Sequence, residues 1–339
     1  MVSARKRKEV SYHESESDSD FESIQESHSR SSKKNSTTSN SKKKPAKRTK
    51  REHSKIVNNN EEKSTELLND DKAKLLSKAS KKDDDTNNVE IISEQHINPG
   101  KIVIPRPKGC PFADSISPDT LEFLAELAEN NDRDFMRLRA KEWAKAKKDF
   151  VDFCGLIMTE LHEVDPSTRL EEGSKAMYRQ NRDVRFSNDK SPYKTNLSAG
   201  FSRTGRKSLD ASYFISIKPG NKSIVAAGMW QPDSARLANM RSSIIRDGNL
   251  LREALSTDAI KELFDGKCGH EVLCTEDKLK VAPKNIAKDH PEIELLRFRT
   301  FAVSKSFTDE EVVSPGFMDK VMDVFEALVP FVTVINAWI

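Results

Sequence analysis

The stretch from Tyr213 to Trp230 reads YFISIKPGNKSIVAAGMW and decides the fold of this chain. Tyr213, Ile215 and Ile217 alternate with other residues, which is the period of a half-buried β-strand. Lys218-Pro-Gly-Asn221 follows with the residue types that tight turns prefer, and a second apolar run completes the stretch. The stretch therefore predicts an antiparallel β-hairpin.

Helices are predicted before the hairpin. Ser117 and Pro118 form an N-cap followed by a first-turn proline, and leucines then recur at helical spacing as far as Glu129. Asp132 can cap a second, longer helix, whose aromatic and aliphatic residues share one side until Asp165-Pro166 ends it. Its lysines are expected on the solvated side.

The hairpin is followed by more helices and one strand. The pattern predicts a helix from Ser234, a shorter one from Thr257, a strand over Glu294–Val303 and a last helix from about Pro315, interrupted near Pro330. No regular strand–helix–strand repeat is present. These elements predict an α+β domain in which an antiparallel sheet is flanked by N- and C-terminal helices.

The chain divides into a tail, residues 1–104, and a domain, residues 105–339. Of the 23 aromatic residues, only Tyr12 and Phe21 lie in the first hundred positions, where Ser, Asn, Lys, Glu and Asp dominate. Such a segment cannot bury enough apolar surface to offset its conformational entropy, so the tail is expected to be disordered. The first hundred positions also carry the whole net charge of +3, because residues 101–339 have 36 basic and 36 acidic residues.

The tail contains a dense basic run that is typical of a nuclear localisation signal or a nucleic-acid patch. Its basic residues are Lys42, Lys43, Lys44, Lys47, Arg48, Lys50 and Arg51. We therefore expect a nuclear import receptor as a partner and a nuclear protein, or otherwise a cytoplasmic one. Four cysteines without framework spacing indicate a reducing compartment. The apolar run Phe325–Ile339 is too short for a membrane span and contains Glu326, so a core helix and no membrane partner are expected.

Several motifs in order resemble the family known as domain of unknown function 2461. They are Tyr178–Lys194, Tyr213-Phe214, Pro219-Gly220, Ala227–Pro232 and the Leu295-Leu-Arg-Phe-Arg299 stretch. The resemblance covers about residues 112–330. It implies the boundary and fold of the domain, and it implies no activity, cofactor or catalytic residue.

The region from Gly173 to Lys222, here called the basic segment, holds 11 basic residues against three acidic ones. Such an excess creates a local positive potential that attracts anions. The candidate ligand or phosphate contacts are Arg179, Arg182, Arg185, Lys190, Tyr193 and Lys194. If residues 182–186 are extended, Asp183 can orient Arg185 while Arg182 points to the other face.

Three interpretations of the basic segment stay open. Its charges form a structural ion-pair lattice, or they bind a polyanion such as nucleic acid, with Phe186, Tyr193 and Phe201 available for base stacking. Alternatively the protein is an enzyme that acts on a phosphorylated or anionic small molecule. In that case Asp183 and Asp189 are the weak catalytic candidates, either by themselves or as ligands of a divalent metal ion. The residues assign no cofactor and no metal site.

Overall fold

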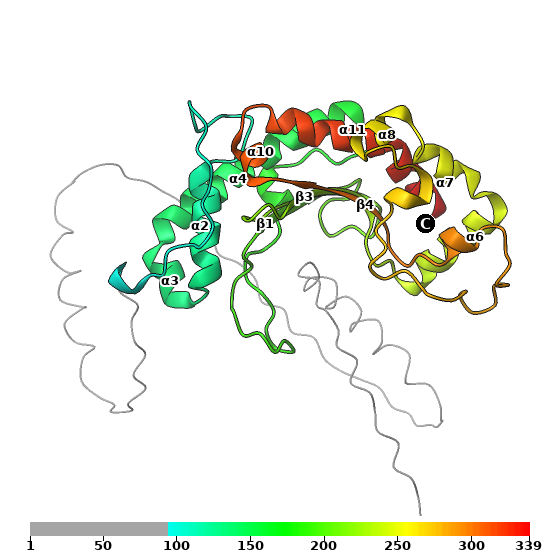
Figure 1. Ribbon diagram of the computed structural model, residues 1–339, viewed down its shortest axis with the longest axis horizontal. Helices are drawn as coiled ribbons and strands as arrows, with labels where there is room; N and C mark the ends of the chain where they lie inside the picture. The colour runs from blue at the N-terminus through cyan, green and yellow to red at the C-terminus, as the bar shows by residue number, and fades with distance from the viewer. Residues whose placement is uncertain (1–93) are drawn as a thin grey trace, which may run out of the picture. The chain divides into compact units, whose positions relative to one another are not determined.

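The computed structural model describes residues 94–339, and the predictions made for residues 1–93, including the basic run of the tail, lie outside it. Four antiparallel strands form one sheet in chain order. They are β1 (Leu197–Phe201), β2 (Ser212–Ile217), β3 (Ser223–Met229) and β4 (Phe301–Phe307). The predicted α+β fold with an antiparallel sheet and flanking helices is confirmed (Figure 1).

The predicted hairpin is β2 and β3, with Ile215 opposite Val225. Its turn contains Gly220 at φ 87°, a left-handed conformation that glycine adopts without steric cost. The carboxylate of Asp309, at the start of α10 (Asp309–Val313), accepts hydrogen bonds from Gly220 N at 2.8 Å and from Asn221 N at 3.0 Å. This buried aspartate therefore ties the hairpin turn to the last part of the chain.

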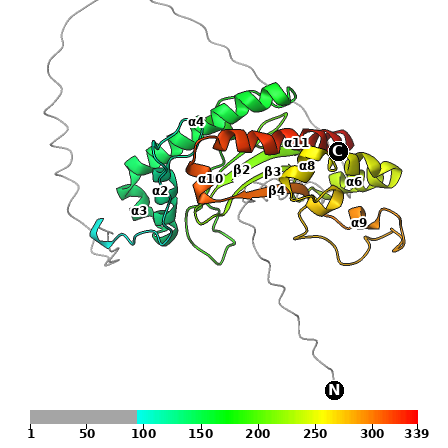
Figure 2. The ribbon, with the colours of Figure 1, turned by 45° about the horizontal axis from the view of Figure 1, so that its top comes forward.

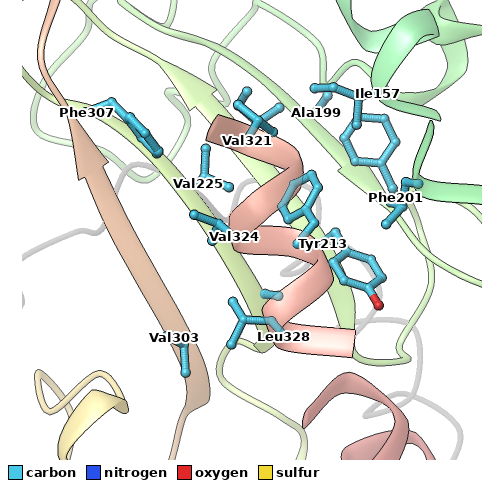
Figure 3. Packing of buried hydrophobic residues seen from close by; sticks show 14 of the residues in the cluster. Ile157, Ala199, Phe201, Tyr213, Val225, Val303, Phe307, Val321, Val324 and Leu328 are labelled. Carbon is cyan, nitrogen blue, oxygen red and sulfur yellow. The ribbon is translucent and has the colours of Figure 1, made fainter. Parts of the chain in front are cut away.

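One face of the sheet is covered by α4 (Ala140–Val164) and α11 (Phe317–Trp338), as Figures 1 and 2 show. Val321, Val324 and Leu328 of α11 are fully buried. Figure 3 shows them against the inward residues of the strands, among them Phe201, Tyr213, Val225, Val303 and Phe307. Each buried Val or Leu side chain contributes about 1.5–3 kcal/mol to stability, so this layer holds the sheet and helices together.

By length and composition, α11 is also apolar enough to cross a membrane. In the structure it lies on the sheet, as expected for a core helix. It continues through Pro330, so the predicted interruption near Pro330 is wrong.

The first helices follow the predicted caps but break at an unpredicted place. Ser117 caps α2 (Pro118–Glu129) and Asp132 caps α3 (Arg133–Leu138) through their side chains. The single long helix predicted from Asp132 is wrong, because the chain leaves helical geometry at Arg139 before α4 begins. No glycine or proline marks this break. Phe135 and Trp143, on either side of Arg139, both contact the ring of Phe123.

The predicted strand over residues 294–303 is wrong in its first half, which contains α9 (Ile293–Leu296). Arg241 donates hydrogen bonds to the carbonyls of Leu296 and Phe298, which are therefore not used in a strand ladder. The predicted helices from Ser234 and Thr257 are confirmed. The remaining elements are η1 (Glu94–His96), α5 (Gly173–Ala176), α6 (Ser234–Asp247), α7 (Asn249–Ala254), α8 (Asp258–Leu263) and η2 (Gly269–Val272).

Candidate anion-binding surface

The central part of the basic segment forms a loop, residues 179–194, here called the basic loop. Its base continues the hydrogen bonding of the sheet: Tyr178 N donates to Ser198 O of β1 at 2.8 Å. The two arms then pair with each other, because Lys194 N donates to Gln180 O and Arg182 N donates to Pro192 O, both at 2.9 Å. Figure 1 shows the loop in green, projecting from the sheet beside α2 and α3.

Asn131, between α2 and α3, anchors the basic loop. Its Nδ2 donates to Tyr193 O at 2.9 Å, and its Oδ1 accepts from Tyr193 N at 3.0 Å. Tyr193, a predicted ligand residue, is half-buried and packs against the hydrophobic core. Asn131 was not predicted as a site residue, although the paired asparagines at 130 and 131 could have drawn attention to it.

The adjacent Asn130 makes the same kind of backbone contact with a different segment. Its Nδ2 donates to Asn98 O at 2.7 Å and to Glu126 O at 2.8 Å, and its Oδ1 accepts from Asn98 N at 2.8 Å. The two asparagines therefore hold two separate segments to the end of α2, and only Asn131 holds the basic loop.

Two ion pairs shape the basic loop. Asp183 accepts from Arg185 Nε at 2.9 Å and from Arg185 N at 3.2 Å, so the predicted orientation of Arg185 by Asp183 is confirmed. Arg182 lies 2.5 Å from the carboxylate of Asp189. The condition considered for residues 182–186, an extended strand, is not met, since this part of the loop is irregular and its carboxylates bond to nearby groups within the loop.

The candidate catalytic aspartates are both strongly acidic. Hydrogen bonds from Arg185 lower the pKa of Asp183 to about 2. Hydrogen bonds from the hydroxyl and backbone N–H of Ser191, and then from Arg182, lower the pKa of Asp189 to about 2. A general base works best when its pKa is near the operating pH, so the geometry gives acid–base catalysis by these residues no support.

The described part of the chain offers no cluster of side chains that could bind a metal ion. Within residues 94–339, no three His, Cys, Asp or Glu side chains lie close enough together to hold a metal ion. All four cysteines, which fall in this range, are free thiols.

The cations of the basic segment lie in four places: Lys175 in α5, and the others in the basic loop, the β1–β2 connection and the β2–β3 turn. In the connection Arg203 lies 3.5 Å from Asp210, so each of the three acidic residues of the segment is next to an arginine of the same segment. The pairs neutralise three of the eleven cations. Counted within the segment alone, an excess of eight positive charges stays, and Lys190 and Lys207 are among the exposed residues that contribute to it.

Tyr178 connects the loop to the β1–β2 connection. Two cations lie near its ring: Lys194 Nζ is 5.7 Å from the ring centroid, and the guanidinium of Arg206 is 5.5 Å from it. The ring lies close over Gly200 of β1, where an added Cβ would come within 2.9 Å of the tyrosine hydroxyl oxygen. Lys194 is only 8% exposed, so this predicted contact residue lies beneath the surface. The ring brings cations from two segments together at the β1 edge of the sheet.

Of the aromatic residues predicted for stacking, only Phe186 is freely accessible. Its side chain is 79% exposed, and the guanidinium of Arg185 lies 5.6 Å from its ring centroid. The prediction that Phe201 is available for base stacking is wrong. Alternation along β1 turns its side chain toward the core, where it contacts Phe325. Lys190, four positions after Phe186, donates a hydrogen bond from Nζ to Val184 O at 2.9 Å.

Two open surface grooves lie away from the basic loop. One, of about 450 Å³, lies between α8 and α11. The other, of about 460 Å³, lies along α2 and α4. Both have several carboxylates in their walls, including Glu262 and Asp323 in the first and Glu122 and Asp152 in the second. Anions are therefore better matched to the basic loop than to either groove.

Comparison with known families matches residues 119–333 to the family described as "Conserved hypothetical protein (DUF2461)". Neither the curated proteins nor the solved structures contain a match to the chain.

Proposed function

We propose that this chain, which belongs to the conserved hypothetical protein family DUF2461, binds a polyanion through its basic loop, with nucleic acid as the first candidate. The observation that carries the proposal is the charge balance of the basic segment. The segment holds eleven basic residues and three acidic ones, and each of the three carboxylates is next to an arginine of the segment. Phosphate groups are the ligands that arginine forks and lysine ammonium groups suit best.

The spacing of the cations on the loop favours an extended ligand over a compact one. Arg179 is on one arm, Arg185 near the end and Lys190 on the returning arm, and all three are exposed. A backbone with repeated phosphates can contact such cations one after another, whereas a single phosphate engages few of them. Nucleic acid also offers bases to the exposed aromatic ring beside them.

The tail extends the proposal to the location of the protein. Its run of seven basic residues between Lys42 and Arg51 suits a nuclear import receptor. A fluorescent fusion of the full chain should accumulate in nuclei. The same fusion with these seven residues replaced by glutamine should not, and nuclear accumulation of both would refute this role of the run.

Binding is tested with the full chain and fluorescent oligonucleotides, by anisotropy at a series of salt concentrations. The loop variant carries Arg179→Gln and Lys190→Gln. A control with the same charge change carries Lys141→Gln and Lys147→Gln on the exposed side of α4. A third variant has the seven basic residues of the tail run replaced by glutamine.

The loop variant should bind more weakly, and the slope of log affinity against log salt should fall by about 0.7 for each lost phosphate contact to a single strand. The control should bind as the wild type does. Equal losses in the loop variant and the control would show a nonspecific charge effect. A loss confined to the tail variant would assign binding to the tail. Either result would refute the proposed role of the basic loop.

A further inference from the structure

Phe186 is an aromatic side chain that the fold does not use. Across residues 94–339 it is the one aromatic residue that is more exposed than buried, whereas Phe123, Phe135 and Phe201 are in the core. A single exposed apolar side chain is common on protein surfaces and needs no special explanation. Phe186 differs because it lies in the most basic part of the domain, next to an exposed arginine.

The ring is presented by a loop that is braced at several points. Asp183 fixes Arg185, and the guanidinium of Arg185 lies 5.6 Å from the Phe186 centroid, so one side of the ring has a fixed cation near it. The pairing of Arg182 with Asp189 joins positions on either side of Phe186 in the loop. A ring presented on an ordered loop loses little conformational entropy on binding, which favours its use as a contact surface.

We infer that the basic loop takes single-stranded nucleic acid, with one base stacked on Phe186 and neighbouring phosphates on Arg185 and Lys190. The inference rests on the proposed function. In a duplex each base is already stacked on both sides, so its face is closed to a protein ring. In a single strand the base faces are accessible, and aromatic side chains stack on them without regard to sequence. A polyanion without bases would gain nothing from the ring.

The experiment compares two fluorescent probes on the full-length protein: oligothymidylate, and the blunt duplex of the same strand with oligoadenylate. The variants are Phe186→Ala and Phe186→Trp. Val281→Ala is the control, since it truncates another exposed apolar side chain, 68% exposed, outside the basic segment. Thermal unfolding of each variant shows whether the substitution disturbs the fold.

Phe186→Ala should weaken binding of the single strand by about 5- to 150-fold, the loss of one base–aromatic stack. Its binding of the duplex and its salt slope should not change, because no charge is removed. Phe186→Trp should restore or improve single-strand affinity, and Val281→Ala should behave as the wild type.

Two outcomes overturn the inference in distinguishable ways. If the single strand binds but Phe186→Ala leaves its affinity unchanged, or weakens both probes equally, the stacking is refuted while the proposed function stands. If the wild type binds neither probe, the proposed function fails and the stacking inference fails with it.

Discussion

Replacing Asn131 with alanine should release the basic loop from the helical part of the domain. The substitution removes both hydrogen bonds that join the Asn131 amide to the backbone of Tyr193, one of 2.9 Å and one of 3.0 Å. The loop then keeps its pairing with β1 and its internal ion pairs, which lie elsewhere. Asn131→Ala therefore loosens the loop without removing any charge from it.

The magnitude follows from the two bonds. A typical intramolecular hydrogen bond contributes about 0.5–1.5 kcal/mol, so Asn131→Ala should lower the free energy of unfolding by about 1–3 kcal/mol. A loosened loop must be ordered again when a ligand binds, so part of the same free energy is lost from binding. The affinity for a single-stranded oligonucleotide should therefore fall, by at most about 150-fold.

Asn130→Ala is the matched control, because it removes the same side-chain type at the adjacent position. Asn130 makes three hydrogen bonds to Asn98 and Glu126, so its loss should destabilise the chain at least as much. It does not contact the basic loop, and its affinity should equal that of the wild type. Urea denaturation measures the stability of both variants, and fluorescence anisotropy measures their binding.

The result that refutes this reasoning is specific. If Asn131→Ala is destabilised but binds the oligonucleotide as the wild type does, the anchoring of the loop plays no part in binding. If neither substitution lowers stability, the hydrogen bonds to Asn98 and Tyr193 do not hold these segments in place.

Two further predictions concern buried polar contacts of the core. The hydroxyl of Tyr213 donates to Asp165 at 2.8 Å, and burial, together with that carboxylate, raises the pKa of Tyr213 above its ordinary value of about 10. As pH rises, the unfolded chain loses this proton before the folded chain does, so the free energy of unfolding should decline above about pH 10. Urea denaturation at about pH 8 and pH 11 measures this decline, and it should be smaller for Tyr213→Phe, which has no proton to lose. An equal decline in the wild type and Tyr213→Phe would contradict this reasoning. Asp309→Ala leaves Gly220 N and Asn221 N without their acceptor. At about 1.5–3 kcal/mol for each hydrogen bond to a charged group, it should lower the free energy of unfolding by about 3–6 kcal/mol in the same measurement. Asp309→Asn keeps one acceptor oxygen and should lower it by less.

The central hairpin was predictable because its information is local. The alternation of Tyr213, Ile215 and Ile217 and the turn residues Pro219 and Gly220 act within a few positions of one another. The strand β1 was not predicted, since Leu-Ser-Ala-Gly-Phe is short, has three small residues at its centre and contains no β-branched residue. It is a strand because β2 supplies its hydrogen-bond partners, which is information from the tertiary structure.

The candidate site divides in the same way between local and distant contacts. The bond between Asp183 and Arg185 spans two positions and was predictable, whereas the contact of Asn131 with Tyr193 spans 62 positions and was not. The accessibility of each aromatic residue also depends on the fold. Phe186 and Phe201 look equivalent in the basic sequence, yet Phe186 is 79% exposed in an irregular loop and Phe201 is 3% exposed on the inner face of β1.

The ion pairs of the basic segment and its proposed ligand contacts are compatible with each other. Asp183 and Asp189 offset the charge of two guanidinium groups, but they also fix the loop that presents Arg185 and the other cations. Without these carboxylates the cations of the loop would repel one another at close range, and the loop would lose the order that its contacts give it. The acidic residues therefore support the positive surface, and neutralising Asp183 should weaken oligonucleotide binding even though it raises the net charge. If Asp183→Asn instead binds more tightly at every salt concentration, charge alone governs binding and the order of the loop does not contribute.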